Sequence, residues 1–288
     1  MNPFLESKDK YRDLMNHQKF IFLQHGIIKD DLSGWLNRYI LNIPRFVTST
    51  KKEFSSIVDG KYDYPQSSIW LTGLPRYDYL YSAPKRFITI MPTWRKYLLS
   101  NFSTETGLRE KKSDFTKSEY FKFYNQLLNN KNLSAAAQKY GYTICFMPHP
   151  NMTPYLDNFS KYNNVRLFTV KEKYRDVFAW SSLIVTDYSS VAFDFAYLRK
   201  PVIYTQFDAE TFFSGKHPYT KGYFDYSKDG FGEVETTIES TVTRIIEYMQ
   251  SDCQLKEQYK HRIDEFFTFH DTNNCQRILE KIKEVDYE

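Results

Sequence analysis

The chain has 288 residues, of which 41% are hydrophobic and 26% are charged, with 24 Phe and 24 Tyr. This length allows one large domain or two modest ones, and this composition excludes overall disorder. The 39 Lys and Arg exceed the 35 Asp and Glu by only 4. Duplex-binding proteins gather basic residues on one face, so we expect no nucleic-acid partner.

The cysteines and the apolar segments indicate the compartment. Cys145, Cys253 and Cys275 are widely spaced and form no CxxC pair, which argues against a disulfide framework and a zinc site. No run approaches about 18 apolar residues, and the first 20 residues lack the apolar core of a secretory signal. We therefore expect a cytoplasmic protein. Aromatic residues mixed with Lys and Arg also suit peripheral contact with an anionic membrane, with a solvated helix face as the alternative.

Short β-rich runs that end in polar or Pro residues predict buried strands. They lie at residues 20–23, 87–91, 142–147, 183–185 and 201–205. Helical segments are expected at residues 118–140, 191–199 and 235–285. Strands that alternate with helices predict an α/β fold with a parallel sheet and helices on both faces.

Two segments between these elements are rich in turn-forming or polar residues. Residues 59–85 hold the densest Gly and Pro content of the chain, so we place a domain connection near residues 81–85. Residues 96–117 are polar and aperiodic, which predicts a long surface loop.

The strongest local motif is Thr186-Asp-Tyr-Ser-Ser190, where a predicted strand ends and a helix begins. Such a junction presents unpaired backbone N–H groups, and Ser189 and Ser190 add hydroxyl donors, so it predicts a phosphate site. The alternative is that one serine only caps the helix. Asp194 is a candidate acceptor for a ribose hydroxyl, with a hydrogen-bonded helix carboxylate as the alternative.

Two histidines, His25 and His149, stand at the ends of predicted strands. Imidazole acts as a base near neutral pH or donates to phosphate when protonated, although a lone loop histidine is more often an ordinary polar residue. Their spacing is not that of a metal site. Arg95 ends the motif Pro92-Thr-Trp-Arg95, and its planar guanidinium suits a diphosphate, with a surface ion pair as the alternative.

Several common nucleotide and hydrolase motifs are missing from the sequence: GxGxxG, GxxxxGK[ST], GxSxG and DxD. A diphosphate would therefore be neutralised by Arg, His, hydroxyl groups and helix N-termini, with no metal and no resident cofactor.

Six motifs follow one another along the chain: His25-Gly26, Gly73-Leu-Pro-Arg-Tyr-Asp78, Met91-Pro-Thr-Trp-Arg95, His149-Pro150, Thr186-Asp-Tyr-Ser-Ser190 with Phe193-Asp-Phe195, and Lys200-Pro-Val-Ile203. In this order they resemble the CDP-glycerol glycerophosphotransferase family, whose enzymes polymerise or decorate teichoic acids and related bacterial capsules. The resemblance runs from about residue 20 to the C-terminus. The TDYSS block followed by KPVI is its most specific part.

The resemblance implies a GT-B fold, two Rossmann-like domains with the active site in the cleft between them. It implies that His25 deprotonates the attacking hydroxyl and that His149 contacts the donor phosphates, which makes these two the catalytic candidates. The donor-binding candidates are Arg95, Thr93, Thr186, Asp187, Ser189, Ser190 and Asp194. The implied reaction moves glycerol phosphate, or a related alditol phosphate such as ribitol phosphate, from a CDP-alditol to a hydroxyl of a cell-envelope polymer, with CMP leaving.

We expect residues 1–84 to form an acceptor-side α/β domain carrying His25, and residues 85–288 to form a donor-binding Rossmann-like domain with a C-terminal helical tail. Only one strand is predicted before His25, so the acceptor-side domain is expected to be shortened. After His25-Gly26 the family often continues Thr-Pro-Leu-Lys, whereas this chain has Ile27-Ile-Lys-Asp-Asp31.

Two other functions stay open at this point. One is a glycosyltransferase of GT-B fold that uses a nucleotide sugar, with Asp194 on the ribose. The other is a truncated, non-catalytic remnant that binds nucleotide or a partner polymerase, which the short acceptor-side segment favours.

Overall fold

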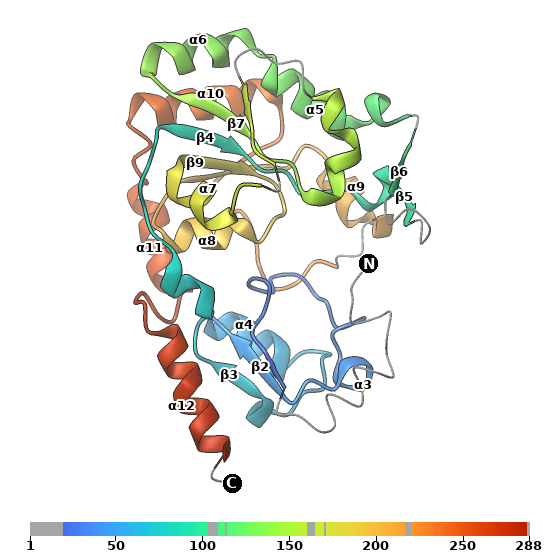
Figure 1. Ribbon diagram of the computed structural model, residues 1–288, viewed down its shortest axis with the longest axis vertical. Helices are drawn as coiled ribbons and strands as arrows, with labels where there is room; N and C mark the ends of the chain where they lie inside the picture. Colours follow the sequence, from blue (N-terminus) through green and yellow to red (C-terminus); the bar gives the residue numbers. More distant parts are fainter. Residues whose placement is uncertain are drawn as a thin grey trace. The chain divides into compact units, whose positions relative to one another are not determined.

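The computed structural model describes residues 20–102, 109–112, 114–159, 165–169, 171–216 and 220–286 (Figure 1). The chain divides into two compact units. The first combines residues 1–79 with residues 266–288, and the second comprises residues 80–265.

The described residues of the second unit form a six-stranded sheet in which every neighbouring pair is parallel. Its spatial order is β11 (Gly232–Glu235), β10 (Val202–Thr205), β9 (Ser181–Thr186), β4 (Phe87–Ile90), β7 (Thr143–Phe146) and β8 (Val165–Leu167). Numbered from β4 along the chain, the order is 3-2-1-4-5-6, that of a doubly wound Rossmann-like sheet. The predicted α/β class with a parallel sheet is confirmed.

Helices cover both faces of this sheet (Figure 1). They are α5 (Glu119–Leu128), α6 (Lys131–Tyr140), α7 (Tyr174–Trp180), α8 (Val191–Tyr197) and α10 (Ile238–Gln250). Successive residues of a strand point to opposite faces. Ile88 and Ile90 accordingly pack in one apolar cluster with residues of α5, α6 and α10, whereas Phe87 and Met91 pack in a second cluster with residues of α7 and α8.

Two sequence expectations in this unit are corrected. The single helix expected at residues 118–140 is two, α5 and α6, because Asn130 caps the second helix by accepting from the Leu133 N–H at 3.0 Å. The loop expected at residues 96–117 contains an antiparallel pair, β5 (Leu99–Phe102) and β6 (Arg109–Lys111). Its apolar residues Leu98 and Phe115 are buried, which anchors the segment; residues 103–108 and 113 lie outside the described part.

The first unit is built on a three-stranded parallel sheet of β1 (Ile21–Phe22), β2 (Arg45–Thr48) and β3 (Ile69–Leu71), in that order. Helix α4 (Lys51–Val58) packs beside β2 and β3, and its Ile57 enters the apolar core of this unit. The strand predicted at residues 20–23 is β1; β2 and β3 were not predicted.

The C-terminal tail is shared between the units, contrary to its expected place in the second domain. Helix α11 (Glu257–Phe266) belongs to the second unit except for its last residue, and α12 (Asn274–Asp286) belongs to the first unit. The Asp78 carboxylate explains the assignment, because it accepts from the Asn274 N–H at 2.9 Å and the Cys275 N–H at 2.7 Å. Gly73 is required there: its φ is +81°, and a Cβ would stand 1.8 Å from the Asn274 Oδ1.

No helix within the described ranges combines the length and apolarity needed to cross a bilayer.

Candidate functional site

The strand order of the second unit selects one place for a ligand. In doubly wound sheets, ligands bind beyond the carboxyl ends of the strands, where the winding direction reverses. Here the reversal lies between β4 and β9, and the segments that follow these two strands carry Thr93 and Asp187. The neighbouring strand β7 leads into His149. Three predicted site segments, far apart in sequence, therefore meet at one edge of one sheet.

The Asp187 carboxylate joins two of these segments. Its Oδ1 accepts from the Thr93 N–H at 2.8 Å and from the Tyr188 N–H at 2.7 Å. Its Oδ2 lies 2.9 Å from Nη2 of Arg95, and both side chains are fully buried. Asp187 thus holds the loop after β4 against the loop after β9.

Arg95 is committed to the protein interior in this structure. Its Nε and Nη2 bond to the Asp208 carboxylate at 2.7 and 3.0 Å, and its Nη1 donates to the Thr93 carbonyl at 2.7 Å. Burial lowers the pKa of the guanidinium, but Asp187 and Asp208 outweigh this and hold that pKa well above its usual value. Its exposed fraction is 0%, so the alternative of a surface ion pair is wrong. The geometry supports a scaffolding role, and direct contact with donor phosphates stays a prediction.

Sequence reasoning missed Asp208. The signal available was its place as a carboxylate three residues after β10, whose carboxyl end lies at the same edge as those of β9 and β4. The Tyr188 hydroxyl also donates to this carboxylate at 3.2 Å. Asp208 therefore ties the loops after three strands into one buried polar network.

The two threonines of the site differ in what their side chains do. The Thr186 hydroxyl donates to the Met91 carbonyl at 2.7 Å, which ties β9 to the end of β4. The Thr93 residue is 6% exposed, and its hydroxyl has no hydrogen-bond partner among the described residues. A buried hydroxyl without a partner is costly, so Thr93 is the better candidate for a ligand contact.

His149 stands at the surface of this edge, half-buried against Trp94, with 6.1 Å between the ring centroids. Its Nδ1 accepts from the Asn151 N–H at 3.1 Å, so in the neutral ring the proton is on Nε2. Burial lowers the pKa of His149 to about 4, although the Asp187 carboxylate pulls it upward. At neutral pH the free site therefore presents a neutral Nε2–H donor.

Ser189 and Ser190 are both partly exposed, as phosphate ligands must be. Ser190 precedes α8 without making a side-chain cap, while Ser189 Oγ accepts a long bond of 3.4 Å from the Val191 N–H. Asp194 lies inside α8 at 1% exposure, so its carboxylate does not reach the surface in this structure. Its contact with a ribose stays a prediction.

His25 lies in the first unit, at the carboxyl end of β1, with an exposed side chain. The preceding Gln24 has a left-handed φ of 72°. The His25 carbonyl accepts from the Arg76 guanidinium, and its ring meets the edge of Phe22 at 5.8 Å between centroids. The imidazole is thus presented at the edge of the first sheet.

A second residue that sequence reasoning missed is Glu53, in the first turn of α4. Its exposed fraction is 0%, and its carboxylate accepts from two backbone N–H groups, those of Ile28 and Ser49. Burial raises the pKa of Glu53 to about 7, although these bonds favour the charged form. The pattern Thr50-Lys-Lys-Glu53 is a capping-box signature and could have drawn attention to it.

The motif residue Lys200 has a structural place. Its buried Nζ donates to three carbonyls, those of Phe178, Ala179 and Ser181, at 2.7 to 2.8 Å. Lys200 thereby links the end of α7 to the start of β9.

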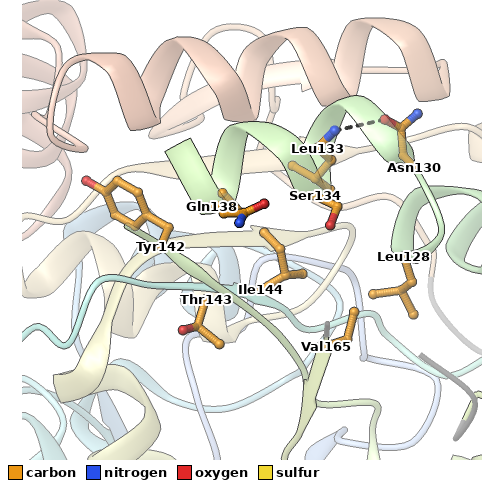
Figure 2. Close-up of a pocket in the computed structure, with 10 residues that line it drawn as sticks. Leu128, Asn130, Leu133, Ser134, Gln138, Tyr142, Thr143, Ile144 and Val165 are labelled. Atoms are coloured by element: carbon orange, nitrogen blue, oxygen red, sulfur yellow. Dashed lines mark hydrogen bonds between the residues drawn. The ribbon is translucent and has the colours of Figure 1, made fainter. Parts of the chain in front are cut away.

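One cavity of about 360 Å³ lies elsewhere on the second unit (Figure 2). Its lining includes Thr143 and Val165, the first residues of β7 and β8, together with residues of α6. It is therefore at the amino ends of the strands and contains none of the predicted site residues. No group of three or more His, Cys, Asp or Glu within the described ranges is arranged to hold a metal ion.

Comparisons with known proteins cover nearly the whole chain. The family model described as CDP-Glycerol:Poly(glycerophosphate) glycerophosphotransferase matches residues 10–284. The chain is 42% identical over 287 residues to the Minor teichoic acid biosynthesis protein GgaB of Bacillus subtilis (strain 168), covering 99% of this chain and 31% of GgaB. It is 23% identical over 258 residues to the Teichoic acid glycerol-phosphate transferase of Staphylococcus aureus (strain NCTC 8325 / PS 47), covering 82% of this chain and 60% of that protein.

A solved structure of the Wall Teichoic Acid Polymerase TagF matches 93% of this chain and 68% of its own, with a TM-score of 0.63 and 21% sequence identity. A likeness at this identity supports the fold. The chain spans about a third of the length of GgaB and less than two thirds of that of the staphylococcal transferase.

Proposed function

The chain belongs to the CDP-glycerol:poly(glycerophosphate) glycerophosphotransferase family, and on that premise we propose that it transfers glycerol phosphate, or a related alditol phosphate, from a CDP-alditol to a hydroxyl of a teichoic acid or capsular polymer. The observation that carries the proposal is the meeting of Thr93, Asp187 and His149 at the point where the winding of the donor-side sheet reverses. A nucleotide diphosphate binds such an edge in doubly wound sheets.

Uncharged hydrogen-bond donors would hold the phosphates of the CDP-alditol. Buried charged groups would hold these hydrogen-bond donors in place. The Nε2–H of His149, the Thr93 hydroxyl and the hydroxyls of Ser189 and Ser190 are the groups offered to the ligand. A bound diphosphate would favour the charged imidazole and raise the pKa of His149 from about 4. The pKa of His149 would then be higher with the CDP-alditol bound than in the free protein.

In the proposed step the acceptor oxygen attacks the β-phosphorus of the donor. A P–O bond forms to the acceptor, the bond from the β-phosphorus to the bridging oxygen breaks, and CMP leaves with that oxygen. His25, exposed on the first unit, takes the hydroxyl proton as general base. The catalysis is positioning and charge stabilisation, and it is proposed to need no resident metal or cofactor; CMP release that persists in EDTA would support this.

The test is release of CMP from CDP-glycerol in the presence of a glycerol phosphate polymer. His25→Ala and His149→Ala should each lower kcat/KM by on the order of 100-fold or more, with the fold retained by circular dichroism. His261→Ala is the matched control, because His261 is exposed on α11 and its ion pair, among the residues that the structure describes, is with Glu265 of the same helix. Full activity in both site variants would exclude this mechanism, and turnover of a UDP-sugar in place of CDP-glycerol would exclude the donor.

The proposal includes peripheral contact with the inner face of the cell membrane, where a lipid-linked acceptor would be met. Helix α3 (Arg38–Leu41) supports it, because Tyr39 is 83% exposed and Ile40 is 49% exposed beside the cationic Arg38. Such residues suit the headgroup region of an anionic bilayer. Sedimentation with phosphatidylglycerol vesicles should be lost in Tyr39→Ser/Ile40→Ser; equal sedimentation of variant and wild type would remove α3 from the proposal.

A further inference from the structure

We propose that Glu53 is a positioning residue for the general base, holding the segment 24–29, the His25 loop, at the carboxyl edge of the first unit's sheet. The inference rests on the proposed function, in which His25 is that base. Glu53 itself touches no substrate in this proposal.

The two carboxylate oxygens bind two different parts of the chain. Oε1 accepts from the Ile28 N–H at 2.7 Å, within the His25 loop, and Oε2 accepts from the Ser49 N–H at 2.7 Å, directly after β2. The loop after β1 is therefore fastened to the end of the adjacent strand through one buried side chain.

Glu53 is itself held in place by its helix. Its own N–H donates to the Thr50 hydroxyl at 3.0 Å, the N-cap of α4. One turn further, Ile57 is fully buried in the core of the unit. The carboxylate thus projects from a rigid element, which is what a positioning group needs.

The His25 loop has a second attachment on the other side of the histidine. The Arg76 guanidinium donates to the His25 carbonyl, and Glu53 holds the N–H three residues later. Between the two attachments the imidazole remains exposed. A general base must reach its proton within about 3 Å, and a displacement of about 1 Å costs on the order of 100-fold in rate. Loosening this loop should therefore affect the chemical step.

The variant that tests this is Glu53→Gln, which keeps the shape of the side chain but replaces one of its two acceptor oxygens with an NH₂ group. The amide oxygen can accept from one of the two N–H groups, while the amide NH₂ opposes the other donor. Ile57→Val is the matched control, because it removes one buried methylene from the same helix and leaves both hydrogen-bonding oxygens of Glu53 in place.

Two measurements on the full chain decide the question. Hydrogen exchange by mass spectrometry should show faster exchange of residues 26–31 in Glu53→Gln than in wild type or Ile57→Val. In the CMP-release assay, kcat should fall on the order of 10-fold or more, while KM for CDP-glycerol stays within about twofold because the proposed donor groups lie on the second unit. Glu53→Asp, which keeps both acceptor oxygens, should recover part of kcat.

Unchanged exchange at residues 26–31 in Glu53→Gln would overturn the proposal, and so would faster exchange with an unchanged kcat. An equal loss of kcat in Ile57→Val would overturn it as well, because general destabilisation would then explain the effect. If wild type releases no CMP, the proposed function fails, and the exchange data alone still decide whether Glu53 fastens the loop.

Discussion

Arg95 and Asp208, 113 residues apart in sequence, form a two-pronged ion pair in the interior, with Nε to Oδ2 at 2.7 Å and Nη2 to Oδ1 at 3.0 Å. Since Asp187 also binds this guanidinium at 2.9 Å, one cation serves two buried carboxylates. The loops proposed to bind the CDP-alditol are therefore held together by buried ion pairs that do not contact the ligand.

Replacement of Arg95 should destabilise the protein severely. Arg95→Met leaves two buried carboxylates without their cation, and breaking a buried pair in this way typically costs about 3–5 kcal/mol. Chemical denaturation measures this loss. Arg175→Met is the control, because the Arg175 side chain is exposed, its pair with Asp176 is at the surface, and such a pair should contribute less than about 1 kcal/mol. A loss below about 1 kcal/mol in Arg95→Met would show that the pair does not stabilise the fold.

His149 should make stability fall as the solution becomes acidic. Its pKa is about 4 in the folded protein against 6.5 ordinarily, so the unfolded chain binds the proton more tightly between these values. The contribution is complete above pH 6.5 and is lost as pH falls toward 4, up to about 3 kcal/mol. His149→Gln should lack this dependence in the free energy of unfolding; parallel curves for both proteins would contradict the burial of the ring.

Glu53 should act with the opposite sign. Burial raises its pKa from 4.5 to about 7, while the hydrogen bonds from the Ser49 and Ile28 N–H groups and, to a smaller extent, the charge of Arg76 pull that pKa down. The folded protein holds this proton more tightly, so its stabilising contribution is complete below pH 4.5 and is lost as pH rises through 7, up to about 3 kcal/mol. Comparing the free energy of unfolding of wild type and Glu53→Gln from pH 4.5 to 8 isolates the effect, and identical slopes would rule it out.

Gly73→Ala should weaken the docking of α12. The left-handed φ of +81° costs about 1–2 kcal/mol for a residue with a Cβ, and that Cβ would displace Asn274 from Asp78. We expect a loss of about 2 kcal/mol or more and earlier proteolysis after residue 266. Gly34→Ala is the control, since a Cβ there meets nothing within 4 Å. Equal stability of the two variants would contradict the tight contact.

The sequence predicted strands where the signal was local. The apolar runs of β4, β7, β9 and β10 are buried on both faces of a parallel sheet and are readable as continuous β-rich stretches. β8 has only three residues, none fully buried, and lies at the sheet edge, so its pattern is weak. The break between α5 and α6 depends on the cap of one asparagine, Asn130, in a segment whose periodicity is helical throughout.

The sequence predicted which loops form the site. It did not predict which side chains in those loops contact one another. Strand ends identified His25 and His149 as residues at sheet edges, and Thr93 entered through the family resemblance. The burial of Arg95 depends on Asp208, which no spacing rule connects to it. Glu53 similarly acts through backbone groups that only the parallel pairing of β1 and β2 brings within reach.

The bonds from Asp78 to the N-terminus of α12 also order the events of synthesis. Asp78 leaves the ribosome 196 residues before Asn274, its hydrogen-bond donor. All six strands of the second unit's sheet lie within residues 80–265, whereas the first unit includes α12, which is translated after the whole of the second unit. At synthesis rates of about 5–20 residues per second, the first unit therefore lacks the bond from Asn274 to Asp78 for roughly ten seconds or more after Asp78 has been made.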